Sequence, residues 1–259
     1  MSHFHPSAGR AAGLVLLLVG LSICALTGAS ATAATATAAG ATAAAANRVF
    51  VPLAAGKVAF GATAIPGIYN EVTAITHAGD DRLFIGEREG RVKILHPDGR
   101  VTVFLDIRHR VIASRGEYGF YDIAFHPGYA DPASPGYGFF YVSFTSGTDE
   151  RAAGGAGAVD VDLIVARFRV SADPNVANPS SEVLLLIVPQ TDDIHKGGAM
   201  EIDPRTNRLF VGVGDDFKNL IAQDPGSPKG KILRLAVDEA PRDATPYQLY
   251  PITTEVWAS

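Results

Sequence analysis

Short segments in which apolar and polar residues alternate recur along the chain from Val49 onward, and turn-forming residues separate them. A period of two places alternate side chains on opposite faces of a strand, whereas a helix repeats its apolar residues every 3.6 positions. No stretch of ten or more residues carries a helical stripe with caps. The pattern therefore predicts an all-β protein. Strands are expected at residues 72–76, 82–87, 91–95, 101–107, 121–125, 139–145, 163–170, 182–188, 199–202, 209–213, 231–237 and 254–258.

One of these strand sequences occurs twice. Arg-Leu-Phe-Ile-Gly at residues 82–86 returns as Arg-Leu-Phe-Val-Gly at residues 208–212, and each copy leads to a strand that begins with glycine and a basic residue. Repeated quartets of antiparallel strands are typical of the blades of a β-propeller. The alternation alone would fit a β-sandwich equally well. The repeat favours a propeller, with about three four-stranded blades in this chain.

Residues 1–31 have the three-part layout of a secretory signal peptide. Arg10 precedes an apolar run at residues 14–28, and Ala29-Ser30-Ala31 supplies a cleavage site of the A-x-A type. The run is shorter than the roughly 20 residues that span a bilayer, which favours a cleaved signal over a retained anchor. We therefore expect an exported protein, secreted, periplasmic or at the cell surface, with no stable membrane span after cleavage. A lipoprotein modified at Cys24 fits less well, because Ile23 precedes it where the lipobox has a small residue.

Residues 32–47 are almost wholly alanine and threonine, a composition with nothing to bury, and they predict a linker before a β domain at residues 48–259. The net charge of −5, without any basic run interleaved with aromatic residues, argues against a nucleic-acid partner. The sequence contains no P-loop, no dinucleotide-binding glycine motif, no nucleophile elbow and no zinc-binding helix.

One loop histidine is a candidate for chemistry, although a solvated loop residue explains its position at least as well. His195 follows Asp192 and Asp193, whose charges would favour the protonated imidazole if they lie near it. The two glycines after Lys196 would suit a pocket wall at which the backbone approaches a ligand. Asp215 ends a later strand in the sequence Gly-Asp-Asp. The strand pattern permits this aspartate to reach the histidine, but a plain turn explains Gly-Asp-Asp equally well.

Two other histidines carry a simpler interpretation. His96 and His126 each precede a proline at the end of an expected strand, and we interpret both as structural. His77 and His109 flank strand ends without a partner that the pattern identifies.

Several segments match, in order, the patterns of one enzyme family. Glu-Tyr-Gly-Phe-Tyr-Asp-Ile-Ala-Phe-His-Pro at residues 117–127 is similar to E/Q-x-G-L-L-G-hydrophobic-A-F-H-P, and His-Lys-Gly-Gly at 195–198 is similar to H-x-G-G. Gly-Asp at 214–215 and Gly-Lys-Ile-Leu-Arg-Leu at 230–235 follow. The series, at roughly residues 72–259, resembles the soluble glucose/sorbosone dehydrogenases, quinoproteins that use pyrroloquinoline quinone (PQQ).

This resemblance implies a six-bladed β-propeller, of which the three expected quartets would be an incomplete part. It implies oxidation of an aldose at C1 to the lactone, with hydride transfer to PQQ and with calcium as a further cofactor. The family's histidine in H-x-G-G is the general base, a role that falls on His195 here. The family's Glu or Gln before G-L-L-G and its aspartate in the G-D strand line the sugar pocket. Those positions are Glu117 and Asp215 here.

The sequence departs from the family pattern around this site. Ile194 stands where the family has an acidic or amide residue, and Leu220 stands where the glucose enzymes have a glutamine. The G-x-R-N-P segment, whose arginine and asparagine contact quinone and substrate, does not occur before Ser259. We therefore expect altered sugar contacts, the main quinone and calcium ligands outside this chain, and no dehydrogenase activity from this chain alone. Two alternatives stay open: a non-catalytic propeller that binds glycans or proteins, and a metal-dependent lactonase-type propeller.

Overall fold

The computed structural model describes residues 49–52, 59–147, 161–218, 220–239 and 254–258. The chain divides into two units, residues 1–66 and residues 67–259. In the first unit the structure describes one antiparallel hairpin, β1 (Val49–Pro52) with β2 (Ala59–Ala62). The sequence does not predict these strands, because four residues are too few for alternation to be recognised. The expected signal peptide at residues 1–31 and the expected linker at residues 32–47 lie outside the described residues.

The described residues of the second unit form three four-stranded antiparallel sheets, in agreement with the alternation of the sequence. Its described residues contain no α-helix and only two short 3-10 helices, η1 (Ile221–Gln223) and η2 (Val237–Glu239). Across the described residues, no helix has the length and apolar character needed to cross a membrane. The strands are β3 (Val72–Thr76), β4 (Leu83–Glu87), β5 (Arg91–Leu95) and β6 (Val101–Asp106) in the first sheet, β7 (Phe120–Phe125), β8 (Phe139–Ser146), β9 (Asp162–Val170) and β10 (Ala177–Val188) in the second, and β11 (Gly197–Asp203), β12 (Arg208–Val213), β13 (Lys231–Ala236) and β14 (Thr254–Ala258) in the third.

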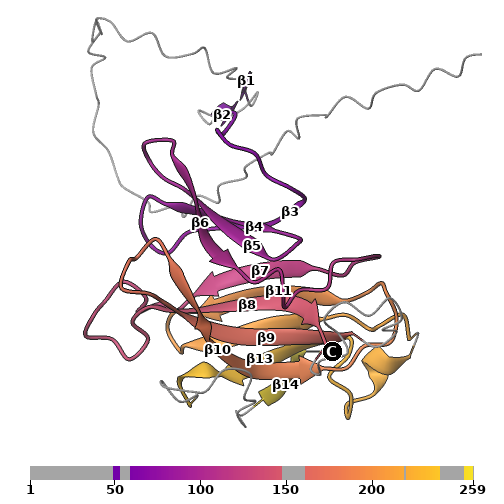
Figure 1. Ribbon diagram of the computed structural model, residues 1–259. Helices are drawn as coiled ribbons and strands as arrows, with labels where there is room; N and C mark the ends of the chain where they lie inside the picture. Colours follow the sequence, from indigo (N-terminus) through magenta and orange to yellow (C-terminus); the bar gives the residue numbers. More distant parts are fainter. Residues whose placement is uncertain (1–48, 53–58, 148–160, 219, 240–253, 259) are drawn as a thin grey trace, which may run out of the picture. The chain divides into compact units, whose positions relative to one another are not determined.

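Each sheet is a meander in which the strands follow one another in chain order. The first strands of the three sheets adjoin, since β7 lies beside both β3 and β11. The second sheet lies between the other two, with one apolar cluster against each neighbour (Figure 1). Four-stranded meanders whose first strands adjoin are the blades of a β-propeller.

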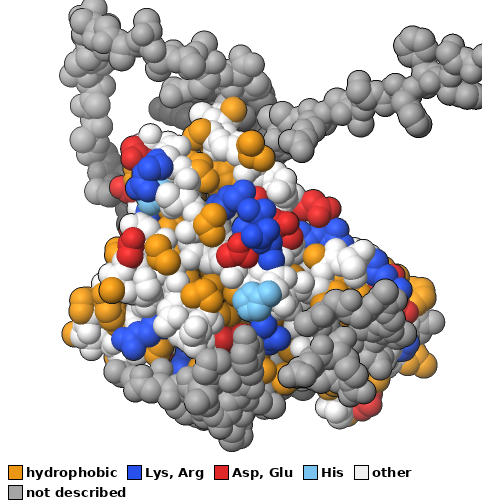
Figure 2. All heavy atoms as spheres, viewed as in Figure 1, with side chains coloured by type: hydrophobic (Ala, Val, Ile, Leu, Met, Phe, Trp, Pro, Cys, Tyr) orange, Lys and Arg blue, Asp and Glu red, His pale blue; other side chains and the backbone are white. Residues whose placement is uncertain are grey.

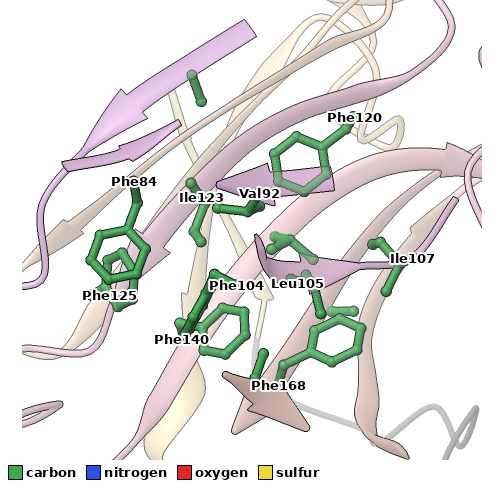
Figure 3. Packing of buried hydrophobic residues seen from close by; sticks show 14 of the residues in the cluster. Phe84, Val92, Phe104, Leu105, Ile107, Phe120, Ile123, Phe125, Phe140 and Phe168 are labelled. Carbon is green, nitrogen blue, oxygen red and sulfur yellow. The ribbon is translucent and has the colours of Figure 1, made fainter. Parts of the chain in front are cut away.

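Strand β8 shows why the second sheet needs a neighbour on each face. All eight of its residues are buried, and successive side chains enter different clusters. Phe140 and Phe144 pack toward the first sheet, whereas Tyr141 packs toward the third. Figure 3 shows Phe140 beside Phe104 and Phe125, with ring centroids 5.0 Å and 5.9 Å away. Because each buried aromatic side chain removes about 150–250 Å² from water, these contacts account for much of the stability of the sheet packing.

Most predicted strand boundaries lie within two residues of the observed ones, and one differs by more. The strand expected at residues 182–188 begins at Ala177, so Asn178-Pro179, predicted as a turn, belongs to β10. The pairing of β10 with β9 is irregular after Asn178. Pro179 has no N–H to donate to a ladder, which confines it to irregular or edge positions. The Ser181 hydroxyl accepts the Arg169 N–H at 2.8 Å in place of a backbone carbonyl. The proline therefore distorts the strand without ending it.

Candidate functional site

The β11–β12 hairpin brings the predicted histidine and aspartate together. Gly197 at the start of β11 pairs with Val213 at the end of β12. The loop before β11 and the loop after β12 therefore meet at one end of the third sheet. His195 Nδ1 lies 2.7 Å from Asp215 Oδ1. The sequence leaves this contact open, and the structure shows that direct antiparallel pairing brings the two loops close enough to make it.

His195 combines an unusual backbone conformation with an accessible ring. Its φ of 57° lies in the left-handed region, and its side chain is 48% exposed. An ionised carboxylate can only accept a hydrogen bond, so the imidazole donates Nδ1–H to Asp215, and in a neutral ring the lone pair is then on Nε2. Of the nearby carboxylates, the one bonded to this ring is that of Asp215 rather than that of Asp192 or Asp193. No described residue forms a hydrogen bond with Nε2.

Phe217 flanks the pair on the loop after β12. Its backbone N–H donates to Asp215 Oδ1 at 3.1 Å, the oxygen that also accepts from His195. Its ring lies edge-on to the imidazole, with the centroids 5.3 Å apart and an interplanar angle of 84°. The side chain remains largely exposed. Two donors, the imidazole and the Phe217 N–H, therefore hold the same oxygen of the Asp215 carboxylate.

Glu117 reaches the same loop from the connection that precedes β7. Its Oε2 accepts the Lys196 N–H at 3.1 Å, and its own N–H donates to the Asp193 carbonyl at 2.8 Å. Arg88 holds this connection, because its Nε donates to the carbonyl of Tyr118 at 2.8 Å. The structure therefore places the exposed Glu117 carboxylate against the backbone of the residue that follows His195.

Glycines allow close contacts inside this region. A Cβ on Gly214 would lie 1.8 Å from the His195 carbonyl oxygen, so only glycine fits there. Gly198 has a φ of 103°, and a Cβ would lie 2.4 Å from the Tyr121 ring. The expectation that both glycines after Lys196 form a pocket wall is therefore wrong for Gly198, which makes room for a side chain of β7. Gly197 does line a groove, together with residues of β12 and β13 such as Gly212.

The most heavily hydrogen-bonded side chain of the region, Asp216, is not singled out by the sequence pattern. Its carboxylate is fully buried and accepts Lys229 Nζ at 2.7 Å and Lys196 Nζ at 3.0 Å. It also accepts the backbone N–H groups of Thr191, at 2.9 Å, and Asp192, at 2.9 Å. Two sequence features point to this cluster, namely the doublet Asp215-Asp216 and the lysine next to His195. Neither feature shows which of the two carboxylates is buried.

The two histidines interpreted as structural are buried and bonded within the fold. His126 Nε2 lies 3.1 Å from Asp238 Oδ1, and its Nδ1 accepts the Gly128 N–H at 2.9 Å. His96 Nε2 lies 2.8 Å from the Thr102 hydroxyl. Both ring nitrogens of His126 are therefore occupied, unlike those of His195.

The described residues do not supply an evident site for PQQ or calcium. Among them, no group of three or more His, Cys, Asp and Glu side chains could hold a metal ion. The carboxylates of PQQ require cations, yet Lys196 and Lys229 beside the histidine are both engaged by Asp216. On the face shown in Figure 2, Lys and Arg side chains lie next to Asp and Glu side chains. Among the ion pairs of the described residues, Lys93 is paired with buried Glu87 at 2.7 Å.

Three adjoining four-stranded meanders, with an exposed histidine–aspartate pair at the end of one of them, define a β-propeller protein with a candidate site on its third sheet. The chain belongs to the glucose/sorbosone dehydrogenase family, which it matches over residues 69–259. The family membership and the propeller fold inferred from the sequence are confirmed.

Individual relatives are distant and longer. Mouse Hedgehog-interacting protein is 32% identical over 185 residues, which cover 66% of this chain and 25% of that protein. The PQQ-bound aldose sugar dehydrogenase of Streptomyces coelicolor is 22% identical with a TM-score of 0.53, over 70% of this chain and 51% of that one. The Escherichia coli aldose sugar dehydrogenase in its apo form is 19% identical with a TM-score of 0.52, over 71% and 51%. The chain thus spans about a quarter of the curated relative and about half of these solved structures.

Proposed function

We propose that the chain supplies the general base of an exported, quinone-dependent dehydrogenase that oxidises an aldose at C1 to the lactone. The observation that supports this most directly is the His195–Asp215 pair. The imidazole is half exposed, its Nδ1 is bonded to Asp215, and Nε2 is not bonded by any described residue. Family membership supplies the reaction class.

The arrangement suits proton abstraction from an alcohol. A neutral imidazole whose Nδ1–H is held by a carboxylate is ready to accept a proton at Nε2. Removal of the C1 hydroxyl proton raises electron density at the sugar carbon and assists departure of its hydride. General-base assistance of this kind contributes about 10²–10⁴-fold to the rate. Asp215 would stabilise the imidazolium that forms. In an enzyme of this kind the quinone is the hydride acceptor, and we infer that residues other than those described hold it.

Glu117 is the proposed sugar contact on the other side of the loop. One of its oxygens accepts the Lys196 N–H, which fixes the carboxylate and leaves Oε1 for a sugar hydroxyl. Ile194 and Leu220 stand where the family has polar groups, and the Leu220 side chain is 78% exposed. We therefore propose an aldose as the substrate class, with contacts that differ from those of the glucose enzymes.

Export is a separate part of the proposal. Residues 1–31 would act as a signal peptide and residues 32–47 as the linker to the propeller. Mass spectrometry of the protein recovered from the periplasm or medium should find an N-terminus near residue 32. A mature N-terminus at a lipidated Cys24 would support the lipoprotein alternative instead.

The reaction is tested in a chimera in which residues 48–259 replace the corresponding part of the Streptomyces coelicolor aldose sugar dehydrogenase. Dye reduction is measured with a panel of aldoses after addition of PQQ and calcium. The chimera should reduce dye, and His195→Gln should lower kcat by about 10²–10⁴-fold while retaining quinone binding. His77→Gln, which changes an exposed loop histidine, is the matched control. Unchanged turnover in His195→Gln contradicts the proposal. This chain alone should give no dye reduction.

A second candidate is a non-catalytic propeller that binds another protein. The 32% identity with mouse Hedgehog-interacting protein favours it. On this alternative no aldose would support dye reduction by the chimera, and His195→Gln would leave protein binding unchanged. The two candidates therefore predict different effects of His195→Gln. The dehydrogenase loses turnover, whereas the binding protein keeps its affinity for its partner.

A further inference from the structure

The Asp216 carboxylate connects the two loops that carry His195 and Asp215. On one side it accepts the N–H of Thr191, the hydroxyl of Thr191 at 3.2 Å and the N–H of Asp192, all in the loop before β11. On the other side it accepts Lys229 Nζ, from the loop between β12 and β13. Lys196 Nζ, from the residue after His195, completes the set. Five groups thus converge on one side chain.

The charges in this cluster make it resistant to rearrangement. The side chains of Lys196 and Asp216 are both 0% exposed, and that of Lys229 is 17% exposed. Burial lowers the pKa of Lys196 despite the opposing effect of Asp216. A buried charge that loses its partner is strongly destabilising, so each ion holds the others in place. The loops cannot separate without leaving an ammonium or a carboxylate unpaired.

The cluster lies one peptide away from both members of the histidine–aspartate pair. Asp216 directly follows Asp215, and its N–H donates to the His195 carbonyl at 3.2 Å. His195, Asp216 and Phe217 have φ values of 57°, 56° and 55°, in the left-handed region that side-chain-bearing residues rarely adopt. Such conformations persist only where the surrounding structure enforces them. The bonds to Asp216 supply that constraint on both loops.

We propose that Asp216 is a positioning residue for the base, and this inference rests on the function proposed above. By joining the Thr191–Lys196 loop to the segment that follows β12, it keeps the imidazole Nδ1 against Asp215. The proton is thereby retained on Nδ1, and Nε2 remains the nitrogen that can accept a proton from a substrate. Asp216 would act through His195 and would not touch the substrate.

Nitrogen NMR of the full chain tests this without sugar or quinone. At about pH 8, where an ordinary histidine is neutral, the Nδ1 and Nε2 shifts report which nitrogen carries the proton. His195→Gln identifies the His195 signals. In the unmodified protein the Nδ1–H tautomer should exceed the Nε2–H tautomer by more than about tenfold, as expected for a hydrogen bond to a charged group. Asp216→Asn should reduce this ratio severalfold or more. Asp224→Asn, an exposed aspartate on the same loop, should leave it unchanged.

Lys229→Gln is the second variant, because it removes one ion pair and leaves Lys196 bonded to Asp216. Lys229→Gln should shift the tautomer ratio in the same direction as Asp216→Asn, by a smaller factor. If Asp216→Asn does not fold, Lys229→Gln becomes the test. A folded Asp216→Asn with a lower melting temperature and an unchanged ratio would show a structural role only and overturn the inference. The inference is also overturned if Asp216→Asn does not fold and Lys229→Gln leaves the ratio unchanged. Because neither measurement involves oxidation of a sugar, this result is independent of the dye-reduction test.

Discussion

Nδ1 of His195 and Oδ1 of Asp215 lie 2.7 Å apart, although the β11–β12 hairpin separates the two residues along the chain. Antiparallel pairing brings the two flanking loops together, because it returns the end of β12 to the start of β11. Each residue of the pair therefore lies in a loop, within two residues of the end of a hydrogen-bonded strand. Loop residues anchored so close to regular elements keep their geometry more faithfully than residues in the middle of a long loop.

Asp215→Asn should reduce the turnover of the chimera without unfolding it. An amide can donate as well as accept, so it no longer selects the tautomer with the proton on Nδ1, and it cannot stabilise an imidazolium. We expect kcat to fall by about 10²–10⁴-fold. Steady-state kinetics provide the measurement, with Asp224→Asn as the control for loss of a loop carboxylate. A kcat within twofold of the parent, on the order of experimental scatter, would contradict the proposed role.

Gly198→Ala should destabilise the fold, whereas Gly212→Ala should not. A Cβ at Gly198 would meet the Tyr121 ring at 2.4 Å on a backbone with a φ of 103°. At Gly212 the nearest atom to an added Cβ is 3.8 Å away and φ is not positive. We expect a loss of about 2 kcal/mol or more at Gly198 and a gain of up to about 1 kcal/mol at Gly212, where alanine restricts the unfolded chain. Urea unfolding midpoints compare the two, and equal midpoints would refute the packing explanation.

Phe140→Ala should remove much of the packing between the first and second sheets. The side chain is fully buried among Phe104, Phe125 and Phe168. Truncation of a buried phenylalanine costs about 3–5 kcal/mol of unfolding free energy. Ile232→Ala, which shortens a side chain that is 38% exposed, should cost much less. Denaturant unfolding gives both values, and similar losses would show that this interface is not the principal core.

The stability contributed by Asp216 should disappear in acid. Burial alone would raise the pKa of Asp216, but hydrogen bonds from Lys229, Thr191, Asp192 and Lys196 outweigh it and hold the pKa well below its ordinary value of 3.8. A depressed pKa in the folded state stabilises that state above the unfolded pKa, and the contribution is lost as the pH falls through the folded value. The difference in unfolding free energy between the parent and Asp216→Asn should therefore be largest near neutrality. It should shrink below about pH 4. A difference that is constant from neutral to acidic pH would exclude this linkage.

Strand β5 shows how much of the fold is readable from the sequence. The prediction for residues 91–95 coincides with its bounds, because the buried Val92 and Ile94 alternate with the partly buried Arg91 and Lys93. Strand β8 has few polar positions to alternate with, yet its aromatic and β-branched residues still identify it. Strands β1 and β2 are too short for a pattern. Asn178-Pro179 misleads because proline usually marks a turn, whereas here the ladder becomes irregular around it.

The candidate site is only partly readable in the same way. His195, Glu117 and Asp215 follow from motifs, and the structure groups them around one loop. Asp215 and Asp216 are identical in residue type and adjacent in sequence, so no pattern shows that the second is buried. That difference depends on three-dimensional contacts with Lys196 and Lys229. A sequence identifies a candidate base more easily than the groups that orient it.

His195 has a left-handed backbone conformation, with a φ of 57°. At this position, the residue that gives the highest thermal stability differs from the residue that the proposed catalysis requires. For a residue with a side chain, this conformation costs on the order of 1–2 kcal/mol, and glycine or asparagine would adopt it more readily. A library selected only for survival at high temperature should therefore accumulate Gly or Asn at residue 195. Such proteins would melt later than the parent and would no longer carry the imidazole. A project to raise the melting temperature of this chain would therefore have to keep histidine at residue 195 and exclude Gly and Asn there.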